Sequence, residues 1–214
     1  MKIKTVIFDM DGVLVDSEPF FRNKVFEFYR RQGIDVPLKE INQLAGSSHQ
    51  FTFSKMAEWY GKGITSKQIE SLYHDTMQDV TYSYSDMLNP YIRYILKKLK
   101  PDYKLAIASS SSMELISKCL KECSIDSYFD LVVTGRDFKE SKPNPEIYLY
   151  TAKQLGVSSD ECVVLEDSTI GITAAKRAGM YTLAHRDLRF NFDQTLADHI
   201  FDDFLEAYVY IQNL

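Results

Sequence analysis

Short apolar runs that end in polar residues recur along the chain and predict buried strands. The first run covers residues 4–8 and ends at Asp9. Three later runs follow the same plan, over 104–108, 131–134 and 162–165. Continuous apolar runs of this length are typical of strands that are buried on both faces of a parallel sheet. Each predicted strand therefore delivers polar residues to its carboxyl end.

Helical periodicity fills the gaps between the later runs. Apolar residues at helical spacing predict helices over 113–122, 145–155 and 170–178, the last of which ends at Gly179. Strands that alternate with helices are typical of an α/β fold with a doubly wound, Rossmann-like parallel sheet. Ligands bind outside the carboxyl ends of the strands in such folds, so we expect the polar residues there to form the active site.

The segment 18–85 interrupts this alternation, because it shows helical stretches and no clear strand. Helices are expected around residues 20–32, 37–44, 51–60 and 66–80. The pattern predicts an inserted α-helical cap over 18–85 and an α/β core formed by 1–17 and 86–214. An insertion directly after the first strand is suited to exclude water from an active site and to select the substrate.

Composition and charge exclude several classes of protein. The 214 residues are 45% hydrophobic and 26% charged, which is ordinary for a globular chain. A formal net charge of -5 disfavours nucleic acid and anionic membranes as partners. No apolar run approaches the roughly 20 residues of a membrane span, and the first residues show no apolar signal core. We expect a cytoplasmic protein that is a monomer or a weak homodimer.

Asp9 and Asp11 are the first candidate catalytic residues. They lie two positions apart at the end of a predicted buried strand, on a tight turn that Gly12 permits. One carboxylate is suited to attack as a nucleophile, and the other to exchange protons with the leaving oxygen. A structural Asp-rich turn is the alternative. It is weakened because two adjacent acids repel each other unless a cation joins them.

Glu166 and Asp167 supply a second pair of acids at the end of another predicted strand. Together with Asp9 and Asp11 they form a set of oxygen ligands, which suits Mg²⁺ because this hard cation prefers oxygen. Asp167-Ser168 alone is more typical of a helix N-cap. The predicted metal role therefore depends on the presence of the first pair.

Ser109, Ser110 and Lys142 are the candidate phosphate ligands. The two serines lie between a predicted strand and a helix, where hydroxyl groups and backbone amides can bind a phosphate. Helix capping is the structural alternative. It accounts for one serine of the run 109–112 and does not need the others. Lys142 precedes Pro143-Asn144-Pro145, a rigid stretch that holds the lysine in place. Its ammonium group is then suited to anchor a phosphate.

Four segments in this order resemble the signature motifs of the haloacid dehalogenase superfamily. They are VIFDMDGVLVDSE over 6–18, Ser109, Lys142-Pro143, and Glu166-Asp167-Ser168 followed by Gly171. The resemblance extends from about Lys4 to the C-terminal region and favours the branch of β-phosphoglucomutase and small sugar-phosphate phosphatases. It implies an α/β core with a helical cap that opens and closes over the substrate.

The resemblance also implies a role for each candidate. It implies that Asp9 is the nucleophile and that Asp11 is the general acid and base. It implies that Ser109 and Lys142 are the phosphate ligands, and that Asp167 and Glu166 are Mg²⁺ ligands. The main-chain carbonyl of Asp11 would join the metal ligands. We therefore expect a magnesium-dependent phosphohydrolase that acts on a small phosphorylated metabolite, such as a sugar phosphate, through an aspartyl-phosphate intermediate.

The cap departs from the pattern of β-phosphoglucomutase. Phe21 stands where that enzyme has a gating histidine, and His49 stands where it has an arginine for a second phosphate. Both departures favour hydrolysis over the mutase reaction, which is the first alternative. Gly46 and His49 are expected to contact the substrate, with an ordinary surface loop as the alternative. A phospho-receiver, whose motifs have another order, and a non-catalytic binding module are the remaining alternatives.

Overall fold

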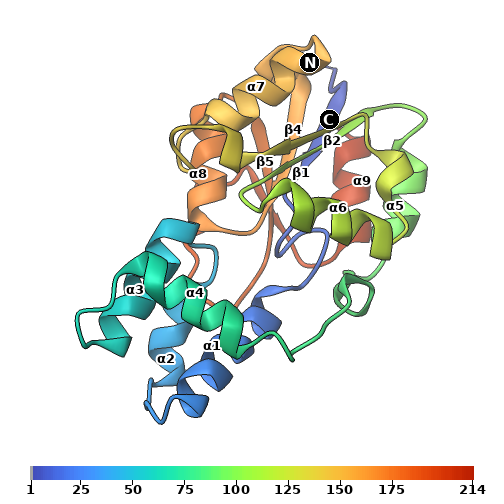
Figure 1. Ribbon diagram of the computed structural model, residues 1–214. Helices are drawn as coiled ribbons and strands as arrows, with labels where there is room; N and C mark the ends of the chain where they lie inside the picture. The colour runs from blue at the N-terminus through green and yellow to red at the C-terminus, as the bar shows by residue number, and fades with distance from the viewer. Residues whose placement is uncertain (1) are drawn as a thin grey trace. The chain divides into compact units, whose positions relative to one another are not determined.

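The computed structural model describes residues 2–214, which divide into two compact units (Figure 1). The core consists of the residues up to Asp16 together with Ser83–Leu214. The cap is Ser17–Tyr82. The cap limits that the sequence predicts, 18 and 85, lie one residue after Ser17 and three residues after Tyr82.

A six-stranded sheet with the strand order β3-β2-β1-β4-β5-β6 forms the centre of the core. Its strands are β1 (Thr5–Phe8), β2 (Lys104–Ser109), β3 (Leu131–Thr134), β4 (Cys162–Glu166), β5 (Tyr181–His185) and β6 (His199–Phe201). All neighbouring strands are parallel. Every residue of β1 is buried, as a continuous apolar run in a central strand requires. The predicted α/β fold is confirmed, and all four predicted strands are present.

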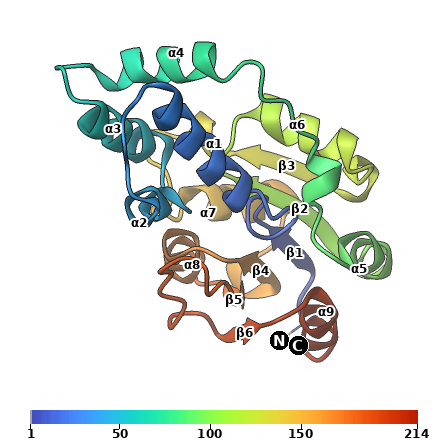
Figure 2. The ribbon, with the colours of Figure 1, turned by 90° about the horizontal axis from the view of Figure 1, so that it is seen from below.

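Helices cover both faces of this sheet (Figure 1 and Figure 2). One face carries α5 (Ile92–Leu99), α6 (Met113–Glu122) and α9 (Phe204–Gln212), and the other carries α7 (Glu146–Leu155) and α8 (Thr169–Arg177). Buried side chains that include Ile7, Val164, Tyr148 and Ala174 join the sheet to α7 and α8. The helices predicted over 113–122, 145–155 and 170–178 agree with α6, α7 and α8 to within one residue. Single 3-10 turns lie at Tyr84–Met87, Asp126–Tyr128, Gly135–Asp137 and Ser159–Glu161.

The cap is helical and has a hydrophobic core of its own. Its elements are α1 (Glu18–Arg31), α2 (Leu38–Ile41), a 3-10 turn at Asn42–Leu44, α3 (His49–Tyr60) and α4 (Ser66–Thr76). Large side chains such as Phe28, Tyr29, Met56 and Tyr73 fill its interior. In place of the helix predicted over 37–44, the structure has the short helix α2 followed by the 3-10 turn. The helix predicted over 66–80 is shorter than expected, because α4 ends at Thr76.

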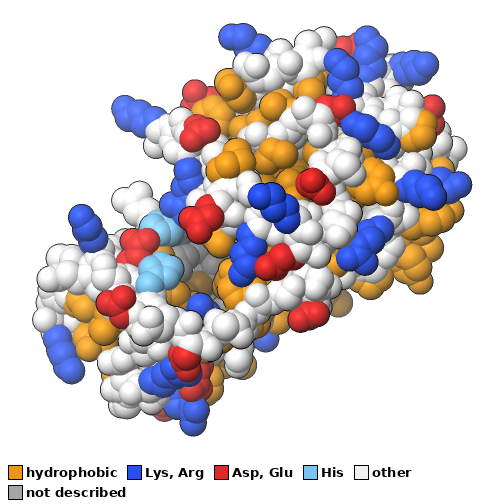
Figure 3. All heavy atoms as spheres, turned by 45° about the vertical axis from the view of Figure 1, so that its right-hand side comes forward, with side chains coloured by type: hydrophobic (Ala, Val, Ile, Leu, Met, Phe, Trp, Pro, Cys, Tyr) orange, Lys and Arg blue, Asp and Glu red, His pale blue; other side chains and the backbone are white. Residues whose placement is uncertain are grey.

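The surface carries charges of both signs. On the face drawn in Figure 3, basic side chains lie among acidic ones instead of gathering in one patch. Among residues 2–214 there is no helix with the length and apolar character that a bilayer crossing demands.

Candidate active site

The register of the sheet brings the ends of three strands to one edge. Phe8, the last residue of β1, pairs with Ile107 of β2 on one side and with Leu165 of β4 on the other. The pairing continues beyond β1, since the N–H of Asp9 donates to the carbonyl of Leu165 at 3.0 Å. Asp9, Ala108 and Glu166, which follow these three positions, therefore lie close together at the carboxyl edge of the sheet.

The loop after β1 turns sharply at Gly12, whose φ of +80° favours glycine. Its N–H donates to the carbonyl of Val15 at 2.7 Å, and the N–H of Val15 donates to the carbonyl of Met10 at 3.1 Å. A Cβ atom at position 12 would lie 2.0 Å from Oδ2 of Asp167. Glycine is thus required by the backbone angle and by the Asp167 carboxylate, which lies directly against this loop.

Lys142 joins Asp9 and Glu166 in one buried ionic cluster. Its Nζ donates to Oδ1 of Asp9 at 2.6 Å and to Oε1 of Glu166 at 2.7 Å. It also donates to the carbonyl of Ala108 at 2.9 Å, so that the three hydrogens of the ammonium group all have acceptors. The structure therefore brings together three of the residues selected from the sequence.

The charge of Lys142 is divided between the two carboxylates. Burial raises the pKa of Asp9 to about 8; Lys142 opposes this effect, while Glu166 and Asp11 reinforce it. Burial also disfavours ionised Glu166, but the charge of Lys142, together with hydrogen bonds, lowers the pKa of that carboxyl. The two acids raise the pKa of Lys142 well above its usual value, although burial acts in the opposite direction. Asp9 is thus the less well compensated acid, and it favours the approach of a further cation.

Glu166 has hydrogen-bond donors at both of its oxygen atoms. Oε1 accepts from Lys142 and, at 2.9 Å, from the hydroxyl of Tyr148. Oε2 accepts from the backbone N–H groups of Asp167 and Ser168 at 3.0 and 3.2 Å, and from the Ser168 hydroxyl at 3.1 Å. These bonds favour Glu166 as the counter-ion that holds Lys142, and its predicted contact with a metal stays a prediction.

Lys142→Met is expected to lower the free energy of unfolding by about 3–5 kcal/mol, because Glu166 then stays buried without a counter-charge. Lys100→Met is the matched control. Lys100 lies 2.6 Å from Asp130, with side chains 34% and 37% exposed, and such a surface pair contributes only about 0–1 kcal/mol. Urea denaturation measures both changes.

Adding Glu166→Gln to Lys142→Met should recover part of the lost stability, because a neutral amide needs no counter-charge. Equal destabilisation by Lys142→Met and Lys100→Met would contradict a buried ionic role for Lys142. The double variant also separates the two explanations of a loss, since lost packing around the lysine stem would not be recovered by neutralising Glu166.

The serines at the end of β2 have different partners. Ser109 is buried, and its Oγ accepts from the N–H of Ser111 at 3.1 Å. The Ser111 hydroxyl donates to Oδ2 of Asp11 at 2.8 Å. Ser112 is the N-cap of α6, and Ser110 is partly buried between these positions. The contact of Ser111 with Asp11 was not predicted, because a run of identical residues does not indicate which member faces the acid.

Gly46 and His49 make their described contacts within the cap. The N–H of Gly46 donates to Oε1 of Glu18 at 2.7 Å. His49 begins α3, and its Nε2 lies 2.7 Å from Oε1 of Glu70. Its ring also packs edge-on against Phe53. The predicted contact of Gly46 and His49 with the substrate stays a prediction.

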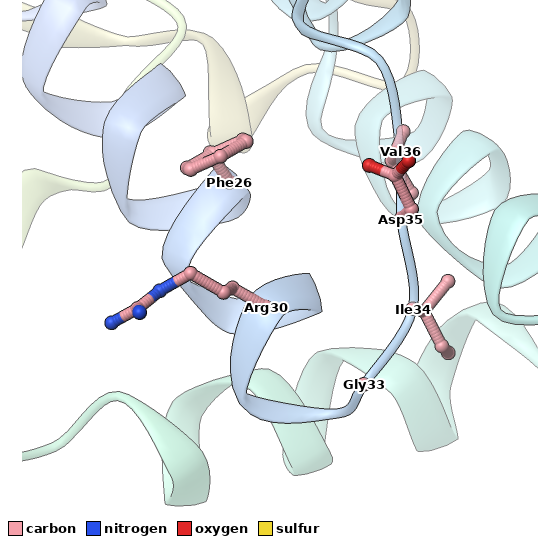
Figure 4. Close-up of a pocket in the computed structure, with 6 residues that line it drawn as sticks. All are labelled: Phe26, Arg30, Gly33, Ile34, Asp35 and Val36. Carbon is pink, nitrogen blue, oxygen red and sulfur yellow. The ribbon is translucent and has the colours of Figure 1, made fainter.

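A cavity of about 260 Å³ lies in the cap (Figure 4). Phe26 and Arg30 of α1 line it together with residues 33–36 of the following loop. The guanidinium group of Arg30 points away from this loop and donates to Glu27 at 2.7 Å. None of the residues selected for phosphate chemistry lines this cavity, so it is not the candidate active site.

Asp9 and Asp167 are candidate ligands for a Mg²⁺ ion. Within residues 2–214, no three His, Cys, Asp or Glu side chains form a complete metal-binding group. Mg²⁺ does not need such a group, because one or two carboxylates commonly hold it together with water and phosphate oxygens. Asp9, whose charge is incompletely compensated, and Asp167, which lies against Gly12, are the carboxylates suited to this role.

Several known proteins are similar to this chain in sequence or in fold. The profile of the haloacid dehalogenase-like hydrolases matches residues 6–185. A phosphorylated carbohydrates phosphatase of Thermotoga maritima is 34% identical over 185 residues, which are 83% of this chain and 82% of the relative. Fructose-1-phosphate phosphatase YqaB of Escherichia coli is 28% identical over 176 residues, which are 82% of this chain and 92% of the relative.

A solved structure shows the same fold. β-Phosphoglucomutase from Clostridium difficile superimposes with a TM-score of 0.78 at 24% identity, covering 99% of this chain and 96% of that chain. The profile match spans most of the chain, and the Thermotoga relative matches over most of both proteins. The chain therefore belongs to the haloacid dehalogenase-like hydrolase family, as its motifs predicted, and is an enzyme of that family.

Proposed function

We propose that this protein is a magnesium-dependent phosphatase that hydrolyses a small phosphorylated metabolite, such as a sugar phosphate, by way of a phosphorylated Asp9. The main support is the 2.6 Å contact between Nζ of Lys142 and Oδ1 of Asp9. It places a positive charge beside the carboxylate that would receive the phosphoryl group. The relatives named for phosphorylated carbohydrates and fructose 1-phosphate support the substrate class.

In the first half-reaction, an oxygen of Asp9 bonds to phosphorus while the bond between phosphorus and the leaving oxygen breaks. Lys142 holds Oδ1, so Oδ2 is the attacking atom. The leaving oxygen takes a proton from the carboxyl group of Asp11, which the Ser111 hydroxyl orients through its 2.8 Å hydrogen bond. The Ser109 hydroxyl binds a phosphate oxygen, and Lys142 binds another by exchanging one of its three protein acceptors for it.

In the second half-reaction, water attacks the phosphorus atom and Asp11 accepts the proton of that water. The acyl–phosphate bond breaks, which restores Asp9 and releases inorganic phosphate. Bound Mg²⁺, held by Asp9, Asp167 and the carbonyl of Asp11, would supply positive charge that offsets the phosphate and the carboxylates. Asp11 therefore serves as acid in one half-reaction and as base in the other.

A substrate screen tests this proposal. Phosphorylated sugars, nucleotides and glycolytic acids are incubated with the protein and Mg²⁺, while released phosphate and isomerised products are both measured. Release of phosphate from none of them, by a folded protein, would contradict a small-molecule phosphatase. The proposal includes no nucleic acid or membrane partner. The cytoplasmic location and the state as a monomer or weak homodimer stay predictions.

Hydrolysis, not isomerisation, is expected as the main activity. A carboxylate, Glu70, lies beside His49 and weakens the attraction of this histidine for a second phosphate. Phe21 packs on Phe20 and Tyr82 and has no proton to transfer. With β-glucose 1-phosphate and a trace of glucose 1,6-bisphosphate, we expect more released phosphate than glucose 6-phosphate. Rapid formation of glucose 6-phosphate with little free phosphate would show that the protein is a mutase.

A further inference from the structure

Gln194 joins two main-chain segments beside the candidate active site. It lies in the connection between β5 and β6, and it is buried, with 8% of its surface exposed. Its Nε2 donates to the carbonyl of Asp167 at 2.6 Å and to the carbonyl of His185 at 2.7 Å. Both amide hydrogens are used, and two carbonyl partners require the amide nitrogen at this position. The side chain thus cross-links the end of β4 to the end of β5.

His185 continues this link to the loop after β1. Its Nδ1 lies 2.9 Å from the carbonyl oxygen of Gly12. Its ring stacks on Phe201 and packs against Phe204, with centroid distances of 5.3 and 4.8 Å. The main chain at Gly12 and the main chain at Asp167 are therefore held by the same residue of β5, directly in one case and through Gln194 in the other.

The Asp167 carboxylate lies between these two main-chain positions. Its Oδ2 occupies the space that a Cβ atom at position 12 would fill, 2.0 Å from the place of that atom. With so little clearance, the direction of the carboxylate depends closely on where the Asp167 main chain is held. Gln194 is itself secured, because the N–H of the preceding Asp193 donates to Oγ1 of Thr169 at 2.7 Å.

We propose that Gln194 is a positioning residue that holds the Asp167 carboxylate beside Gly12 and thereby sets the affinity of the site for Mg²⁺. The inference rests on the proposed function, in which Asp167 holds the metal. Removing a hydrogen bond that orients a metal ligand typically weakens metal binding by about 10–100-fold. No motif of the sequence includes Gln194, because its role depends on main-chain carbonyls from two other strands.

Gln194→Met tests this role, because methionine has a similar size and shape but no donor. Gln212→Met is the matched control, since Gln212 of α9 is exposed and its side-chain amide donates to the Tyr103 hydroxyl at 3.3 Å. Calorimetric titration of the substrate-free protein measures the dissociation constant of Mg²⁺. We expect about a tenfold or larger rise for Gln194→Met and less than about a twofold change for Gln212→Met. At saturating Mg²⁺, KM should stay near the wild-type value.

Gln194→Asn is the second variant, because it keeps an amide at the buried position but is one methylene too short to reach both carbonyls. It should also raise the dissociation constant of Mg²⁺, and it serves if Gln194→Met does not fold. Folded Gln194 variants that bind Mg²⁺ as tightly as the wild type, even with a lower thermal midpoint, would overturn the inference alone. A wild-type protein that binds no Mg²⁺ would overturn the proposed function and the inference together.

Discussion

Asp9→Asn is expected to lower turnover by at least about a thousandfold, equivalent to about 4 kcal/mol of activation free energy. The asparagine amide cannot take the place of the carboxylate nucleophile that accepts the phosphoryl group. The fold should persist, because asparagine has the same shape and its Oδ1 can still accept the hydrogen bond that Lys142 donates to Asp9. Phosphate release from a good substrate and the thermal midpoint measure the two effects.

Asp126→Asn is the matched control, because Asp126 is exposed at the surface of the α/β unit and should tolerate the same change. A second readout follows the intermediate itself. Acid quenching during turnover should leave one phosphoryl group on the wild-type peptide that contains Asp9, and none on this peptide of Asp9→Asn. A folded Asp9→Asn protein with near wild-type turnover would contradict the covalent mechanism.

Chelation of divalent cations should lower activity by at least about a thousandfold, since a bound metal contributes several kcal/mol of charge stabilisation. Lys142 already compensates Glu166, and the pKa of Asp9 is raised to about 8 by burial. A phosphate dianion adds further negative charge to this cluster. Activity is measured after exhaustive treatment with EDTA and again after Mg²⁺ is restored, which should recover it.

The thermal midpoint of the chelated protein shows whether the fold survives the treatment. Asp167→Asn should raise the concentration of Mg²⁺ that gives half-maximal activity, whereas Asp160→Asn, at an exposed position, should leave it unchanged. Full activity after exhaustive chelation would exclude Asp167 as a metal ligand in the reaction. It would also reopen the mechanisms that use no metal.

The strands and helices at the centre of the fold were predictable because their signals are local. A fully apolar run such as β1 and the 3.6-residue period of α6 need no information from distant residues. The end of the sheet was not predicted. β5 mixes polar residues with apolar ones and β6 has three residues, so both depend on the neighbouring strand for their conformation. The helix α5 was not predicted either, although its signal is local. Its sequence shows an apolar stripe at Ile92, Ile95, Leu96 and Leu99.

The sequence by itself determined the α/β core with its helical insertion. It also selected Asp9, Lys142 and Asp167 as candidate site residues. Both results follow from motif spacing and apolar periodicity, which are properties of short segments. Only the tertiary structure decided how these groups are connected. Asp9 and Lys142 are distant in the sequence. The parallel register of β1, β2 and β4 brings Asp9, the Ala108 carbonyl and Glu166 to one edge, where all three accept hydrogen bonds from Lys142. The pairing of Glu166 with Lys142 depends on that register, and the link through Gln194 depends on the pairing of β4 with β5. Each of these hydrogen bonds joins chain segments that no local pattern relates.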